Sequence, residues 1–163
     1  MTKHNEVGNW AAKEFEETKL GDKRLTNRLM QIANSLSNMP ESPINQACGG
    51  WSEAKATYRF FQNEKIKEKS ILATHISKTV ERIDHHEKIL AIQDTTYFTY
   101  SNHKKTTGLG ILSRKAGIHI KNIETKGLIM HTTLAVSTKG LPLEILDQKI
   151  HARPAQLRAT ATH

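Results

Sequence analysis

The sequence predicts an α+β protein in which a helical amino-terminal half is followed by a group of β-strands. Two observations predict this order. Before residue 84, apolar residues recur every third or fourth position in several segments, which is the spacing of helices with one buried face. After Lys88 they occur in short continuous runs, as in strands. We therefore expect a helical domain of residues 1–86 and a sheet domain of residues 87–163.

The charge balance favours a polyanionic partner. Lys and Arg total 24 against 16 Asp and Glu, which gives a formal net charge of +8. Basic side chains gain affinity for nucleic acid because they release the counterions condensed on its phosphates. A basic surface that serves only solubility is the alternative.

A membrane or secreted protein is not expected. No apolar run approaches the roughly 18 consecutive residues that cross a bilayer, and Met1–Gly8 is polar, unlike a secretory leader. The single cysteine, Cys48, can form no internal disulfide. These features predict a cytoplasmic location.

Two helices are expected before residue 39. In the first, Val7, Ala11 and Phe15 recur every fourth residue, and Gly21 is expected to end it. Asp22 can cap the second helix at its amino end. The residues expected to face the core of this second helix are Leu25, Leu29, Ile32 and Leu36.

The opposite face of the second helix carries a row of cationic and amide groups. Arg24, Arg28 and Gln31 follow the same helical spacing, so they lie on one side. Guanidinium pairs bind phosphates well. An ordinary solvated charged face is the competing interpretation, and this pattern alone does not decide between the two.

A short helix, a glycine turn at Gly49-Gly50 and a longer helix are expected next, in the order of a helix-turn-helix variant. In the longer helix Tyr58 and Arg59 combine a stacking ring with a bidentate donor, and we predict that Arg59 contacts DNA. Phe60 and Phe61 are expected in the core. A further helix of about residues 68–84 is predicted to bury Leu72, Ile76, Val80 and Ile83.

Three strands are expected in the second half. The run Ile89–Ile92 suits a strand buried on both faces, and Asp94 follows it, where an acidic residue invites a catalytic role. Residues 128–137 and 141–150 read as two strands joined by a turn in which Gly140 adopts a positive φ. The basic stretch of residues 101–126 between them is expected to be a loop or a hairpin extension.

Several phrases occur together and in order along the chain. They are Trp10-Ala11 with Phe15, Leu20-Gly21-Asp22-Lys23-Arg24-Leu25, Tyr58-Arg59-Phe60-Phe61-Gln62-Asn63, Gln93-Asp94-Thr95-Thr96, Gly108-Leu109-Gly110, the strand around His131, Gly140-Leu141-Pro142-Leu143 and Ala152-Arg153. With them the chain resembles bacterial insertion-sequence transposases of the group named after insertion sequence four, from about Trp10 to Arg153. Each motif is weak alone, and the ordered set is specific.

The resemblance implies a helical domain that binds transposon ends, followed by the first three strands of a ribonuclease-H-like domain with an Asp, Asp, Glu triad. Asp94 matches the first member, which is both catalytic and a ligand of Mg²⁺. The family's second Asp and its Glu lie beyond the positions present here, so we expect an incomplete, truncated catalytic domain that holds Mg²⁺ only weakly. Glu144 and Asp147 match neither position and are expected to face solvent.

Three functional hypotheses stay open on this basis. One is a transposase that binds double-stranded terminal repeats through Lys23, Arg24, Arg28, Tyr58 and Arg59 and cuts with Mg²⁺ at Asp94. Another is a DNA-binding remnant or inhibitor of transposition that occupies ends without cutting. The third is a remnant that does not fold stably, because an uncovered sheet exposes an apolar face and an edge. Protein partners, if any, are a second copy or a full-length transposase in a mixed dimer.

Overall fold

The computed structural model describes residues 10–102, 105–117 and 120–154. It contains helices and an antiparallel sheet, and it divides into two compact units, residues 1–84 and residues 85–163. Val7, which the sequence placed at the start of the first helix, lies outside the described residues.

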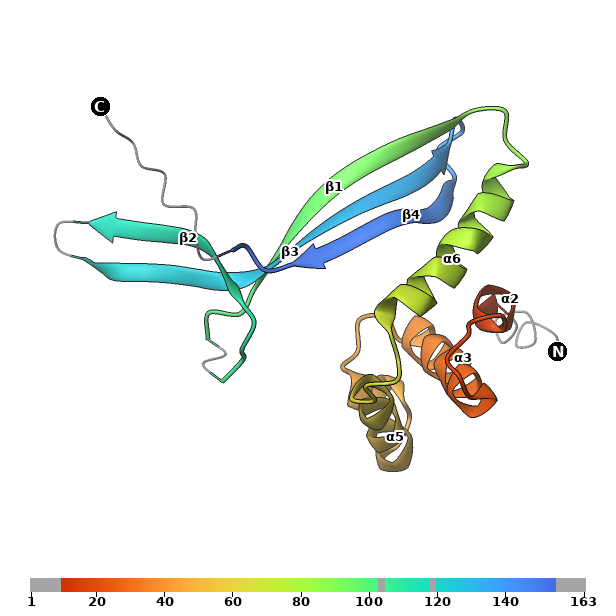
Figure 1. Cartoon of the computed structure of the whole chain (residues 1–163), viewed down its shortest axis with the longest axis horizontal. Helices are drawn as coiled ribbons and strands as arrows, with labels where there is room; N and C mark the ends of the chain where they lie inside the picture. Colours follow the sequence, from red (N-terminus) through yellow and green to blue (C-terminus); the bar gives the residue numbers. More distant parts are fainter. Residues whose placement is uncertain (1–9, 103–104, 118–119, 155–163) are drawn as a thin grey trace. The chain divides into compact units, whose positions relative to one another are not determined.

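The first unit is helical. Its elements are α2 (Trp10–Phe15), α3 (Lys23–Asn38), α4 (Ile44–Ala47), α5 (Trp51–Phe61) and α6 (Glu68–Ile83). Helix α3 contacts α2, α4 and α5, and α6 contacts α2 (Figure 1). A one-turn helix, a turn with Gly49 at a φ of 69° and the longer α5 therefore follow each other in the predicted order.

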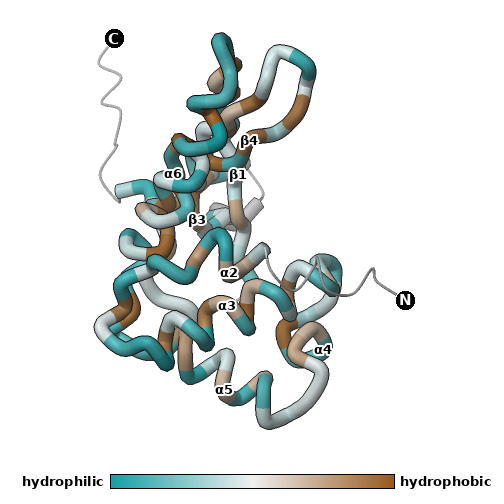
Figure 2. Tube along the Cα trace, turned by 90° about the vertical axis from the view of Figure 1, so that its right-hand side faces the viewer, coloured by the Kyte–Doolittle hydropathy of each residue, from teal (hydrophilic) through white to brown (hydrophobic). Residues whose placement is uncertain are grey.

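Helix α3 begins and packs as its sequence predicts. Asp22 is the residue before it, and its carboxylate accepts a hydrogen bond of 2.8 Å from the backbone N–H of Arg24. Hydrophobic and hydrophilic residues mix along α3 and α5, as expected of helices with one buried face (Figure 2). The core consists of Leu20, Leu29, Ile32 and Phe60, against which Phe15, Leu25, Leu36, Ile66 and Ile71 pack.

The first described helix ends earlier than predicted. It ends at Phe15, whereas the sequence suggested Gly21. Thr18 is buried in the following segment, and its carbonyl accepts a hydrogen bond of 2.9 Å from the hydroxyl of Thr26. Gly21, with a φ of 81°, serves the turn into α3 and not the end of α2.

A buried carboxylate joins α2 to α6. Glu14 is 8% exposed, and its oxygens lie 2.5 Å from Nδ1 of His75 and 2.8 Å from Nη1 of Arg82. Burial raises the pKa of Glu14, but the hydrogen bond and charge of Arg82, together with His75, outweigh burial and leave this pKa lowered. Glu14 is therefore ionised at neutral pH and binds both side chains.

Helix α6 follows its predicted apolar stripe only in part. Leu72, Ile76 and Ile83 are half-buried, but Val80 is exposed and its neighbour Thr79 is completely buried. The hydroxyl of Thr79 donates to the carbonyl of His75 and accepts from Arg82. The prediction is therefore wrong for Val80, beside which a hydrogen-bonded threonine is buried.

The second unit is a four-stranded antiparallel sheet around one long strand. Strand β3 (Ile120–Ser137) pairs with β1 (Ile89–Thr99), β2 (Gly110–Gly117) and β4 (Pro142–His151). Strand β2 pairs with its first part, and β1 and β4 pair with its second part (Figure 1). Gly140 has a φ of 83° in the turn between β3 and β4, as predicted.

The stretch between β1 and β3 forms a hairpin, so there are four strands where three were expected. Two glycines allow close approach of neighbouring backbones here. A Cβ atom at Gly127 would collide with the carbonyl oxygen of Phe98, and one at Gly110 would collide with the backbone of Arg153. No other residue fits these two positions without displacing backbone.

The prediction that the first strand is buried on both faces is wrong for the described chain. Leu90 is 54% exposed and Ile92 is 48% exposed, and β1 pairs along one edge only, with β3. The apolar run Ile89–Ile92, which suggested burial on both faces, lies on β1, but no described element covers it.

Candidate nucleic-acid interface

The outer face of α5 is the strongest candidate for a binding surface. Successive residues of an α-helix are turned by about 100°, so Trp51, Lys55, Tyr58, Arg59 and Gln62 fall on one side. All five are exposed, and Trp51 is 80% exposed. The opposite side is buried in the unit through Ala54, Thr57 and Phe60. We call these five exposed residues the α5 face.

The two cations of the α5 face are free to bind a ligand. Within the described part of the chain, neither Lys55 nor Arg59 forms an ion pair or a side-chain hydrogen bond. Their side chains lie beside two exposed rings, Trp51 and Tyr58. Paired rings and cations of this kind suit phosphate binding together with stacking or apolar contact to bases.

The cations predicted on α3 are differently placed. Arg24 is exposed, but its guanidinium is 2.8 Å from Asp22, and this hydrogen bond lowers the pKa of Asp22 and raises the pKa of Arg24. Arg28 is 2.5 Å from Glu53 of α5, so it ties the two helices together. Lys23 is exposed at the first turn and has no ion pair among the described residues. The predicted row on α3 therefore contains two neutralised guanidinium groups.

The aromatic residues of α5 only partly follow the prediction. Phe60 is buried in the core, as expected, but Phe61 is exposed and its assignment to the core is wrong. Phe61 is the last residue of α5, and no described element covers it there. Sequence reasoning missed Trp51 and Gln62, although their helical spacing with Tyr58 is the signal that finds them.

Asp94 lies on β1 in the second unit. Its side chain is exposed, and its Oδ2 atom accepts a hydrogen bond of 3.1 Å from the hydroxyl of Thr96. A carboxylate with free lone pairs fits a divalent cation as one ligand. Among the described residues, however, no group of three His, Cys, Asp or Glu side chains gathers to hold a metal ion. Asp94 therefore suits one position of a larger site.

The two acids of β4 are placed as expected. Glu144 and Asp147 on β4 are both exposed. Glu144 has a φ of 91° beside a change of register between β3 and β4. The two features occur together, as in a β-bulge, which places one extra residue on one strand.

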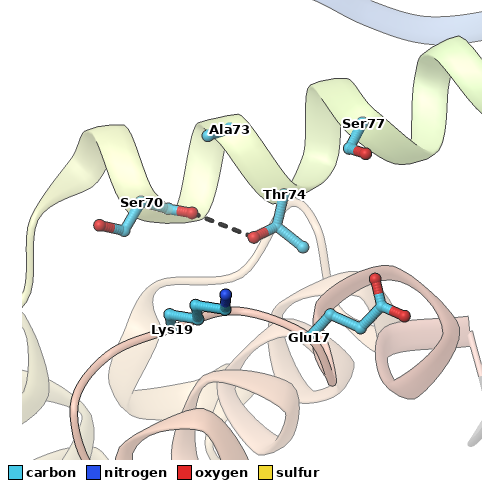
Figure 3. Close-up of a pocket in the computed structure, with 6 residues that line it drawn as sticks. All are labelled: Glu17, Lys19, Ser70, Ala73, Thr74 and Ser77. Atoms are coloured by element: carbon cyan, nitrogen blue, oxygen red, sulfur yellow. Dashed lines mark hydrogen bonds between the residues drawn. The ribbon is translucent and has the colours of Figure 1, made fainter.

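A shallow pocket of about 330 Å³ lies beside α6 and the segment after α2 (Figure 3). The hydroxyl of Thr74 donates to the carbonyl of Ser70 at 3.1 Å, and the carboxylate of Glu17 is 3.4 Å from Lys78. Among the residues that line it, no base lies within hydrogen-bond distance of a serine hydroxyl, which catalysis by a serine nucleophile requires. The lining residues are Glu17, Lys19, Ser70, Ala73, Thr74 and Ser77.

Comparison with known families bears on the helical unit. Residues 7–66 match the family model of transposase DNA-binding. This match spans 60 of the 163 residues. It contains α3, α4 and α5, hence the whole α5 face, and it ends before Asp94. The helical unit is thus similar to transposase DNA-binding domains, whose partner is DNA, and an antiparallel sheet follows it in the chain.

The structure also bears on the membrane question. Among the described helices, none combines the length and the apolar character that crossing a bilayer requires.

Proposed function

We propose that this chain binds the terminal repeats of a transposable element, as the DNA-recognition part of a cut-and-paste transposase of the insertion-sequence-four group. The observation that carries the proposal is the α5 face, which lies inside the transposase DNA-binding match and presents two unpaired cations beside two exposed rings. Helix α5 follows a short helix and a glycine turn, as the recognition helix does in helix-turn-helix proteins.

Each part of the α5 face has a separate task in this proposal. Arg59 is long enough to reach guanine through two hydrogen bonds in the major groove, which is the commonest specific contact to a base. Lys55 and Lys23 contact phosphates, which set affinity but carry no sequence information. Tyr58 and Trp51 pack against sugars or bases, so that the helix is held in one register.

The ion pair between Arg28 and Glu53 orients α5 for this task. Arg28 projects from α3 and binds a carboxylate on α5, so the two helices are held at a fixed rotation. This contact and the buried residues Ala54, Thr57 and Phe60 attach α5 to the rest of the unit, while its other side stays exposed. In this proposal Arg28 supports the interface and contacts DNA only at its edge.

We further propose that Asp94 is the first of three carboxylates in a ribonuclease-H-like catalytic domain. Two divalent ions held by such carboxylates supply an activated water or 3′ hydroxyl and a stabilised leaving oxygen at a phosphodiester. In the described chain Asp94 offers one carboxylate, whose orientation is held by the hydroxyl of Thr96. The antiparallel order of β1, β3 and β4 and the uncovered residues of β1 support this proposal, because a larger domain would cover them.

Occupation of transposon ends without cutting is a second candidate function. It is favoured by the isolated position of Asp94, since the described residues bring no further metal-binding side chains around it. Such a protein would compete with an active transposase for the same ends, or pair with it in a mixed dimer. Strand cutting by this 163-residue chain that Asp94→Ala abolishes would exclude this candidate.

Selection from duplexes with a randomised central segment tests the main proposal. We expect one sequence to be enriched, and its preference over a scrambled duplex to persist as salt screens the phosphates. Binding that is equal for all duplexes and falls steeply with salt would show that the chain only attracts DNA by charge.

A further inference from the structure

Strand β2 and the first part of β3 form a two-stranded ribbon. Residues 120–126 of β3 pair with β2 alone, because the pairing of β3 with β1 begins at Gly127 and its pairing with β4 begins at Ile129. This ribbon extends beyond the three-stranded part of the sheet (Figure 1). We call β2 and residues 120–126 the ribbon. Within the described part of the chain, no further strand pairs with either of its long edges.

The sequence of the ribbon, and of the segment that leads into it, is basic. Between Asp94 and Glu124 the chain contains five Lys and Arg residues and no acidic residue. This is the longest stretch of the sequence without an acid, whereas acids and bases alternate more closely in the helical unit. The positive charge of this stretch therefore has little compensation within its own sequence, which favours a polyanionic partner.

The described cations of this region differ in what they already bind. Lys105, Arg114 and Lys126 are all exposed. The guanidinium of Arg114 is 3.0 Å from the carboxylate of Glu124 on the neighbouring strand. Lys105 and Lys126 form neither an ion pair nor a side-chain hydrogen bond with any described residue. Two cations are thus available to a ligand, and an acid holds the third.

The base of the ribbon is attached to the rest of the sheet on both sides. The backbone N–H of Lys126 donates to the hydroxyl of Ser101 at 3.1 Å, and its carbonyl accepts from the N–H of Tyr100 at 2.8 Å. On the other strand, the guanidinium of Arg153 donates to the carbonyl of Leu112 at 3.0 Å. These contacts fix the direction of the ribbon at its base, so binding there orders less chain than binding by a loose loop would.

Double-stranded DNA fits the ribbon in both charge and size. Neighbouring strands lie about 4.8 Å apart, and the major groove of B-DNA, about 12 Å wide, admits a two-stranded ribbon. Seven paired residues extend over about 23 Å, which is long enough to meet several successive phosphates. The helical unit of the same chain matches transposase DNA-binding, so DNA is the polyanion that the rest of the chain favours.

We infer that the ribbon is a second DNA-binding element of this chain, which contacts the phosphates of double-stranded DNA through Lys105 and Lys126 and does not read sequence. Contacts of this kind set affinity and position. Glu124 limits the affinity, because it holds the guanidinium of Arg114 away from DNA. The inference goes beyond the proposed function, since it requires no recognition of terminal repeats by the α5 face.

The salt dependence of binding to a scrambled duplex, measured with the full chain, tests the inference. In Lys105→Ala/Lys126→Ala we expect the slope of log affinity against log salt to fall by about 2, one for each phosphate contact removed. The ratio of affinities for the selected and scrambled duplexes stays as in the wild type. The matched control is Lys88→Ala/Lys139→Ala, which removes the same charge from exposed residues at the opposite end of β3 and leaves the slope unchanged.

A variant that strengthens binding separates a contact with DNA from a role in stability. Glu124→Gln releases Arg114 from its ion pair and removes a negative charge from the ribbon. We expect tighter binding to the scrambled duplex and a slope that is larger by about 1. Glu144→Gln, which removes an exposed acid from β4, is the matched control and leaves both quantities unchanged. Unchanged affinity in Glu124→Gln would overturn the part assigned to Arg114.

Equal slopes in the ribbon variant and in its control would overturn the inference. That outcome is expected if the lysines only keep the unpaired edges from joining the strands of other chains, as edge lysines do in many sheets. Failure of the proposed function gives a different result, in which the wild type prefers no duplex although the ribbon variant still lowers the slope. Circular dichroism spectra that match the wild type show that each variant is folded.

Discussion

Helices α3 and α5 both carry cations on their surfaces, but the two surfaces differ in what those cations already bind. On α3, Arg24 is paired with Asp22 and Arg28 with Glu53. On α5, Lys55 and Arg59 have no ion pair among the described residues, and two exposed rings lie beside them. A row of cations in a sequence therefore does not show which of them can bind a ligand, because neighbouring acids form ion pairs with some of them.

The largest expected effect concerns the stability of the helical unit, which carries both surfaces. Glu14→Ala removes the carboxylate that holds His75 and Arg82 and leaves both groups without it in a partly buried place. We expect the free energy of unfolding, measured by urea denaturation, to fall by about 3 kcal/mol. Glu17→Ala is the control, since the exposed pair of Glu17 with Lys78 contributes at most about 1 kcal/mol. Equal losses in the two variants would contradict the importance of the buried network.

The same carboxylate predicts how stability depends on pH. The pKa of Glu14 is lower in the folded chain than its ordinary value of 4.5. Its contribution is therefore complete above pH 4.5 and is lost as the pH falls through the lower pKa of the folded state. Urea denaturation at a series of pH values should show the advantage of the wild type over Glu14→Gln shrinking in this acidic range. An advantage that stays constant there would contradict the assignment.

Arg59→Ala is expected to cause the largest loss of sequence-specific binding. If Arg59 binds a base edge, its removal weakens binding to the selected duplex by about 1–3 kcal/mol and relaxes the preference at one base position. Fluorescence anisotropy with the selected duplex and with single-base variants measures both effects. A preference that survives unchanged at every position would remove Arg59 from the base-reading residues.

Trp51 offers a smaller and more local test of the α5 face. In a Trp10→Phe background it is the only tryptophan of the chain. Stacking of a base on the exposed ring should quench its emission, because nucleobases accept an electron from the excited indole. Trp51→Ala is expected to weaken binding by about 1 kcal/mol, at the low end for stacking contacts. Emission that is unaffected by saturating DNA would place Trp51 outside the interface.

Arg24→Ala should give the smallest effect on recognition. Its guanidinium is exposed and paired with Asp22, so it contributes at most one phosphate contact. We expect all duplexes to be weakened alike and the slope of log affinity against log salt to fall by about 1. A loss confined to the selected duplex would mean that α3 reads sequence.

Much of the helical unit could be predicted because its signals are local. The cap at Asp22 and the apolar spacing of Leu29 and Ile32 act within one helix, and the structure has both as predicted. The burial of Thr79 on α6 could not be predicted from apolar spacing, because its partner Arg82 belongs to a network around Glu14, which is distant in sequence. The ion pair of Arg28 with Glu53 escaped sequence reasoning for the same reason.

For the sheet, the turn at Gly140 was predictable from one residue, whereas the exposure of Ile92 was not. An apolar run indicates that a strand is suited to burial on both faces, but the covering elements lie elsewhere in a chain or assembly. The role of Asp94 stays a prediction, which rests on its place after that run and on the resemblance to transposases. Its place opposite Thr132 of β3 depends on strand register, which sequence alone does not give.

The comparison between the two cationic surfaces is tested most directly with two double variants that remove the same charge. Binding of Lys55→Ala/Arg59→Ala and of Lys23→Ala/Arg24→Ala to the selected and scrambled duplexes is measured across a salt series. We predict that the α5 variant binds both duplexes equally, whereas the α3 variant is weaker on both but keeps the wild-type ratio. If the α5 variant kept that ratio and the α3 variant lost it, recognition would lie on α3 and the assignment to α5 would be wrong.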